Sequence, residues 1–195
     1  MSKNVAWLTI TSLACVGLVI VFRQFDATLA YLYAASLAIG VAYSVPPVRL
    51  KTRPLAAMIS IALCRGFLLN FGVHSAAANA LGFPFEWRLP VLFITIFVTC
   101  FSVIIAATKD LADVKGDRIN AITTFATMVG VDKVSRAAAG LLMANYAGAV
   151  VLGITQTETF SSFVMVVSHF VLAVALTVNV CRLHYRDAYS DQGTK

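Results

Sequence analysis

The sequence predicts an all-α fold, a polytopic bundle of about six transmembrane helices. Of its 195 residues, 59% are hydrophobic and only 12% are charged, and the mean hydropathy is +0.84. A soluble domain carries about 25% charged residues, so this chain has too little polar surface to cover a water-soluble globule. The charges are also segregated, which leaves long uncharged tracts. Tracts of this kind lack the residue alternation of a membrane β-barrel, and helices remain as the spanning structure.

Each span needs roughly 20 predominantly apolar residues. Six tracts meet this requirement, and the connections between them are loops rather than domain linkers. The six tracts are Val5–Phe22, Ala27–Tyr43, Leu55–Ala78, Pro90–Ala107, Ala137–Gly153 and Phe160–Cys181. Residues 1–195 are therefore expected to form a single membrane-embedded domain.

The basic residues predict how the spans are oriented. With six spans, all but three of the 15 Lys and Arg residues fall on the side that carries the N-terminus. Arg23 and Arg88 fall on the other side, and Arg65 lies within the third span. This asymmetry is the positive-inside pattern, so the basic side faces the cytoplasm or its organellar equivalent. The net charge of +6 thus reflects orientation in a bilayer, and no nucleic-acid-binding module is visible.

Three aspartates follow the fourth span directly, on the basic side. Asp110, Asp113 and Asp117 have the spacing i, i+3, i+7, which places them on one face if the segment is helical. Three carboxylates that close to a low-dielectric boundary repel each other and favour a bound cation. Mg²⁺ is commonly held by one or two carboxylates, with water and substrate phosphate completing its shell. The spacing predicts a Mg²⁺ site here.

Basic residues interleave with these aspartates. Lys109, Lys115 and Arg118 suit the oxygens of a diphosphate that the metal does not neutralise. Acidic residues that can bind a metal lie here beside basic residues that can bind phosphate, at a membrane surface. This combination indicates a site that ionises a lipid diphosphate. The alternative is a solvated loop of mixed charge.

A second polar stretch follows the second span. Pro46 and Pro47 end that span and force an extended turn. The turn brings four side chains to the same side as the aspartates, as candidates to hold a diphosphate: Tyr43, Ser44, Arg49 and Lys51. The alternative is a basic loop that only anchors the chain at the membrane surface.

The third span contains an arginine. An ionisable residue inside a span is costly and usually faces a cavity or a partner, so Arg65 is a candidate pocket residue. Asn70 lies close to one turn further on and is expected to face the same cavity or to form an interhelical hydrogen bond.

Three stretches of the sequence resemble the UbiA superfamily of membrane prenyltransferases. They are A-Y-S-V-P-P-V-R-L-K (42–51), C-R-G-F-L-L-N-F-G-V (64–73) and T-K-D-L-A-D-V-K-G-D-R (108–118), the last running on into T-T-F-A-T-M-V-G-V (123–131). Within the superfamily, the likeness is greatest to the homogentisate prenyltransferases of plastids and cyanobacteria. The stretch 64–73 points to the solanesyltransferase branch, in which plastoquinone precursors are made.

The resemblance implies an activity and a set of roles. It implies Mg²⁺ between two Asp-rich motifs, of which Asp110, Asp113 and Asp117 form the second. Loss of diphosphate from a prenyl diphosphate would leave an allylic cation, which attacks the ring of homogentisate as the carboxyl group is lost. By resemblance the diphosphate contacts are Lys109, Arg118, Arg49 and Lys51, beside Tyr43, and the acceptor contacts are Arg65 and Asn70.

The resemblance also implies more chain than this sequence contains. The first Asp-rich motif of the family, of the N-x-x-x-D-x-x-x-D kind, would precede Met1, and the family has further spans. The chain is expected to be a partial one, inactive or nearly so on its own, from a plastid or cyanobacterial membrane.

Other interpretations differ in the acceptor or in the class of protein. A chlorophyll synthase-like enzyme or a hydroxybenzoate prenyltransferase would share the same diphosphate chemistry, and a degenerate remnant would have lost it. A transporter subunit fits less well, because transporters place polar groups near the midplane and here the acids lie at the end of a span. The sequence leaves the prenyl chain length and the oligomeric state open.

Overall fold

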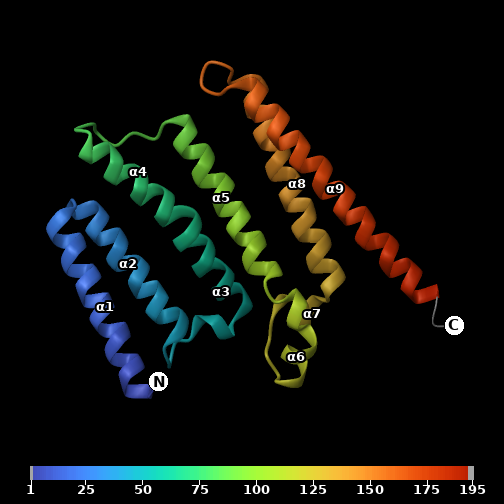
Figure 1. Ribbon diagram of the computed structural model, residues 1–195, viewed down its shortest axis with the longest axis horizontal. Helices are drawn as coiled ribbons and strands as arrows, with labels where there is room; N and C mark the ends of the chain where they lie inside the picture. Colours follow the sequence, from blue (N-terminus) through green and yellow to red (C-terminus); the bar gives the residue numbers. More distant parts are fainter. Residues whose placement is uncertain (1, 193–195) are drawn as a thin grey trace. The chain divides into compact units, whose positions relative to one another are not determined.

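The computed structural model describes residues 2–192, apart from the side chains of residue 3 and residues 183–192 (Figure 1). Within the described residues, six helices are long and apolar enough to cross a membrane, which confirms the predicted number. Between residues 2 and 192 the regular structure is all helical, which confirms the predicted fold class. The six spans are α1 (Lys3–Gln24), α2 (Ala27–Ser44), the continuous run of α3 (Pro54–Ile61), η2 (Ala62–Leu68) and α4 (Leu69–Ala80), then α5 (Leu89–Thr108), α8 (Val131–Thr155) and α9 (Ser162–Gln192).

The chain divides into two compact units, Met1–Ala106 and Ala107–Lys195. The first unit contains α1 to α4 and nearly all of α5. The second contains two short helices, α6 (Val114–Ile119) and α7 (Phe125–Val129), and the long pair α8 and α9. Because this division reflects contacts and not independent folding, the single-domain organisation remains a prediction.

In the first unit, α2 packs against both α1 and α4 (Figure 1). Asp26 begins α2 with its carboxylate accepting the Thr28 N–H at 3.1 Å. Pro46 and Pro47 follow the last residue of α2 and, as predicted, end it. The chain then turns through the 3₁₀ helix η1 (Leu50–Thr52) into α3.

The third span changes its helical form midway. Over Ala62–Leu68 it is a π-helix, and the Leu69 N–H donates to the Cys64 carbonyl, five residues back. Gly66 lies within this turn against α5, where a Cβ would be 2.5 Å from the Thr99 Cα. Glycine is therefore required for the backbones of η2 and α5 to approach this closely.

Aromatic rings join the end of the third span to the segment that follows it. Phe85 lies edge-on to Phe71 with 4.8 Å between ring centroids, and Trp87 stacks on the same ring at 5.5 Å. Trp87 also stacks on Phe67 at 6.3 Å. The segment between α4 and α5 is thereby held along the side of α4.

In the second unit, α8 and α9 form a closely packed antiparallel hairpin. Gly153 faces α9 so closely that a Cβ would lie 2.6 Å from the Met165 Cβ. Further along, the rings of Tyr146 and His169 are 6.2 Å apart, and His169 Nδ1 is 2.7 Å from the Met165 carbonyl oxygen. The two helices match the fifth and sixth predicted spans.

Candidate functional site

The aspartate segment of the second unit is not one continuous helix. Asp110 lies in a turn, a 3₁₀ helix, η3, covers Leu111–Asp113, and α6 begins only at Val114. Asp113 has φ −115° and ψ 20°, outside helical values, at the junction. The expectation that the three aspartates share one helical face is therefore wrong, because the i, i+3, i+7 rule requires an unbroken helix.

Asp110 is paired with its neighbour. Both of its carboxylate oxygens accept hydrogen bonds from Lys109 Nζ, at 2.7 and 2.8 Å. The two side chains are partly exposed, 39% for Lys109 and 29% for Asp110. Each neutralises the other, so a ligand of either residue must compete with this ion pair.

Asp113 and Asp117 differ from Asp110 in forming no ion pair among the described residues. Asp113 Oδ1 lies over Gly116, where a Cβ would be 2.4 Å from it, so a larger residue at this position would displace the carboxylate. Asp117 is 7% exposed, and its Oδ2 is buried without a hydrogen-bond partner among the described residues. A buried, unpartnered carboxylate oxygen is energetically costly, and a bound ion or an ordered water would satisfy it.

The chemistry of these donors fits a hard divalent cation, although they do not enclose one. In the described part of the chain, no three His, Cys, Asp or Glu side chains converge as a ready metal cage. Mg²⁺ does not require such a cage, since it is usually held by one or two carboxylates together with water and phosphate oxygens. Asp117 supplies a free buried oxygen and Asp113 an unpaired carboxylate, which is what such a shared site needs.

Two further cations in this unit remain free to meet an anion. Lys115 and Arg118 are both exposed on α6, and no ion pair within the described residues occupies either side chain. They flank Asp117 in the sequence, and this part of the unit therefore presents negative and positive groups side by side.

The first unit carries the other predicted residues. Tyr43 is half-buried at the end of α2, and Arg49 and Lys51 are exposed in the turn that follows. Arg49 has a left-handed backbone (φ 37°), and its carbonyl accepts the Thr52 hydroxyl at 2.9 Å. Both basic side chains are without an ion pair in the described structure. The turn is thus an unneutralised cationic loop.

Arg65 borders a cavity within the first unit. The cavity has a volume of about 440 Å³ and lies between α1, α2, η2 and α4. Its lining is mainly apolar, and the polar groups beside Arg65 are Tyr33, Ser36 and Cys64. No hydrogen bond or ion pair of the described residues engages the guanidinium group. An unpaired cation beside an apolar membrane cavity calls for an anionic ligand.

The cavity and Tyr43 belong to one face of α2. Ser36 and Tyr43 are seven residues apart, so helical geometry places them on the same side, one above the other. This face leads from the cavity at Arg65 towards the basic turn. Sequence reasoning missed Tyr33, Ser36 and Cys64 as lining residues, and the heptad spacing from Tyr43 was the only available signal for Ser36.

Asn70 does not point across to another helix. Its Nδ2 donates to the Gly66 carbonyl at 2.6 Å and approaches the Arg65 carbonyl at 3.5 Å. Both acceptors belong to the same span, so the interhelical hydrogen bond expected for Asn70 is wrong. A direct contact of Asn70 with an acceptor remains a prediction.

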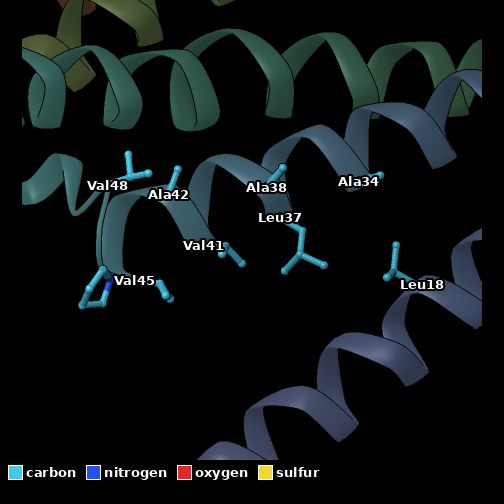
Figure 2. A pocket seen from close by; sticks show the side chains of 9 residues that line it. Leu18, Ala34, Leu37, Ala38, Val41, Ala42, Val45 and Val48 are labelled. Atoms are coloured by element: carbon cyan, nitrogen blue, oxygen red, sulfur yellow. The ribbon is translucent and has the colours of Figure 1, made fainter.

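A second hollow lies on a different face of α2 and is entirely apolar (Figure 2). This groove of about 460 Å³ runs from Leu18 of α1 along α2 to the turn at Val48. The groove and the cavity at Arg65 are lined by different residues of α2. The groove is lined by Ala34, Leu37, Ala38, Val41 and Ala42. The cavity is lined by Leu29, Leu32, Tyr33 and Ser36. Without a polar group the groove cannot recognise a diphosphate or a carboxylate, and the surface is suited to hydrocarbon.

Comparison with known proteins identifies the family. The sequence profile of the UbiA prenyltransferase family matches residues 1–194. The chain belongs to the UbiA prenyltransferase family. Members of the UbiA family are membrane-embedded helical proteins that generally use divalent metal ions, in agreement with the six spans and with the donors at Asp113 and Asp117.

Among UbiA relatives, the chain is 47% identical over 176 residues to the probable homogentisate phytyltransferase 2, chloroplastic, of Oryza sativa subsp. japonica. It is 46% identical over 176 residues to the homogentisate solanesyltransferase, chloroplastic, of Arabidopsis thaliana. Each alignment covers 90% of this chain and 46% of the relative, so the chain spans about half the length of these relatives. It is also 35% identical to the 2-acylphloroglucinol 4-prenyltransferase, chloroplastic, of Humulus lupulus, over 100% of this chain and 47% of that protein. No solved structure matches it.

Proposed function

We propose that this chain carries part of the active site of an enzyme that transfers a polyprenyl group from a prenyl diphosphate to homogentisate, with decarboxylation and with Mg²⁺ as the metal. The observation that carries the proposal is Asp117, a buried carboxylate with one oxygen unpartnered, in a segment that also presents Lys115 and Arg118. Two relatives that are nearly half identical to the chain are named as homogentisate prenyltransferases. They support a plastid or cyanobacterial membrane as the location.

In this proposal Asp113 and Asp117 hold Mg²⁺, and Asp110 completes the motif once it separates from Lys109. When bound, the metal withdraws charge from the diphosphate and so favours its departure. Breaking the bond between the prenyl carbon and the diphosphate oxygen leaves the electron pair on the diphosphate.

The chain's own cations then act on the leaving group. Arg118 is an exposed side chain of α6, available to donate hydrogen bonds to diphosphate oxygens. Arg49 and Lys51, the other predicted diphosphate contacts, are exposed in the turn after α2. Lys109 joins them when it exchanges Asp110 for a phosphate oxygen. Tyr43 adds a hydroxyl at the same end of α2.

The cavity at Arg65 supports an acidic aromatic acceptor. Homogentisate is an aromatic acid, and the guanidinium lacks a counter-ion beside an otherwise mainly apolar cavity. A carboxylate on Arg65 with the ring against apolar walls satisfies both features. An acylphloroglucinol, the acceptor that the hop relative is named for, has no carboxylate to offer this cation. The cavity therefore favours an acid as the acceptor.

A chimera tests the proposal. The matched 176 residues of the Arabidopsis homogentisate solanesyltransferase are replaced by those of this chain, and Mg²⁺-dependent prenylation of homogentisate is measured in membranes. We expect activity that is lost in the Asp117→Asn chimera and retained in an Asp132→Asn chimera, because Asp132 is an exposed partner of Arg136 on α8. A chimera that folds in the membrane without prenylating homogentisate would contradict the assignment.

A further inference from the structure

The side chain of Asn70 donates a hydrogen bond to the backbone of the π-turn in the third span. In a regular α-helix the Leu69 N–H would bond to the Arg65 carbonyl, but here it bonds to Cys64. The Arg65 carbonyl therefore loses its usual donor, and inside a bilayer no water replaces it. The Asn70 side chain lies at these carbonyls, with Nδ2 at 2.6 Å from the Gly66 oxygen and 3.5 Å from the Arg65 oxygen.

The turn also determines where Arg65 points. A π-turn holds one more residue than an α-turn, so removing it would rotate the preceding part of the span by about 100° against α4. Arg65 and Cys64 lie inside the turn, whereas Leu69, Gly72 and Val73 line the same cavity from beyond it. Loss of the extra residue would therefore shift Cys64 and Arg65 around the helix axis relative to the residues of α4 that line the same cavity.

We propose that Asn70 is a positioning residue: its side-chain amide stabilises the π-turn and so holds Arg65 at the cavity, in register with α4. The role is distinct from a direct contact between Asn70 and the acceptor. The inference rests on the proposed function in one respect, the identity of the anion that binds to Arg65. The tight approach of Gly66 to Thr99 fixes the other side of the same turn.

The chain offers a matched pair of substitutions at this position. Asn70→Ala removes the donor, whereas Asn70→Ser keeps a hydroxyl that can bond to the carbonyl four residues back. Such bonds already form in this unit, from Ser60 to the Ala56 carbonyl at 2.7 Å and from Thr95 to the Val91 carbonyl at 2.7 Å. Asn79, exposed near the end of α4, provides the control Asn79→Ala.

Cys64 reports the register directly, because it lines the cavity beside Arg65. The 195-residue chain is placed in lipid nanodiscs with its other cysteines replaced by alanine, and the rate of Cys64 alkylation by N-ethylmaleimide is measured. The replaced residues are Cys15, Cys100 and Cys181. Equilibrium binding of homogentisate to the same samples is measured in parallel.

We expect Asn70→Ala to change the alkylation rate severalfold and to weaken homogentisate binding by about fivefold, the effect of one net hydrogen bond on the population of the binding-competent turn. Asn70→Ser should keep the Cys64 alkylation rate of the unmodified chain, and Asn79→Ala should keep both that rate and the binding of homogentisate. The inference is overturned if Asn70→Ala leaves the alkylation rate unchanged, or if Asn70→Ser changes it as much as Asn70→Ala does. If the register responds as expected but Arg65→Gln binds homogentisate normally, Asn70 keeps its positioning role and the acceptor assignment in the proposed function is what fails.

Discussion

Asp117 offers a test in which stability and ligand binding change in opposite directions. The carboxylate is 7% exposed, and one of its oxygens has no partner in the described structure. Asp117→Asn keeps the shape of the side chain and removes the charge. If this charge is buried in order to bind a metal, removing the charge should raise the free energy of unfolding and lower the affinity of the site for the metal.

The magnitude follows from the burial. A buried polar atom without a partner costs about 1–3 kcal/mol, and more when the group is charged. The asparagine amide still has to be accommodated, so we expect a net gain of about 1 kcal/mol in the free energy of unfolding. Loss of a charged ligand should lower the affinity for a divalent cation by about tenfold or more.

The assay combines unfolding of the chain in mixed detergent micelles with Mn²⁺ binding followed by electron paramagnetic resonance. Asp132→Asn is the control, since Asp132 is an exposed ion-pair partner of Arg136 one helical turn away. Losing that pair should cost at most about 0.5 kcal/mol and leave Mn²⁺ binding unchanged. A destabilised Asp117→Asn chain that still binds Mn²⁺ with its original affinity would refute the reasoning.

Three glycines give further predictions. Gly66→Ala should destabilise the chain by about 1–3 kcal/mol, because its Cβ would lie 2.5 Å from the Thr99 Cα and the two backbones would have to separate. Gly40→Ala, which meets open space, should instead gain up to about 1 kcal/mol in the same unfolding assay, and equal stability of the two variants would argue against the close approach. Gly116→Ala should displace the Asp113 carboxylate and reduce Mn²⁺ affinity by about tenfold with little change in stability. Unaltered Mn²⁺ binding in Gly116→Ala would remove Asp113 from the proposed site.

The spans could be predicted because they depend on composition and length alone. A tract such as Leu55–Ala78 is apolar enough to cross a bilayer whatever its neighbours do, and the helices found differ from the predicted tracts mainly at their ends. The end of α2 was equally predictable, because Pro46 cannot continue a helix. The residue types of the site, acids beside bases after α5, were also readable from the sequence.

Features that depend on packing between segments could not be predicted from the composition and length of the spans. The π-turn at Ala62–Leu68 exists where Gly66 meets Thr99, a contact between segments distant in sequence. The break before α6 places Asp113 outside helical geometry, although nothing in the spacing signals it.

The aromatic contacts of Trp87 have a consequence for how the protein sits in a bilayer. At 1.5 Å per residue, the 27-residue run Pro54–Ala80 is about 40 Å long, whereas the 20-residue α5 is about 30 Å long. The segment that joins the two helices must therefore run back along α4 by the difference between their lengths. The rings of Phe85 and Trp87 hold this segment against α4. Immersion depth at this end is then set by ring stacking and not by the lipid. We expect the α4–α5 end to keep its depth when bilayer thickness varies, with the mismatch taken up as tilt of α1 and α2.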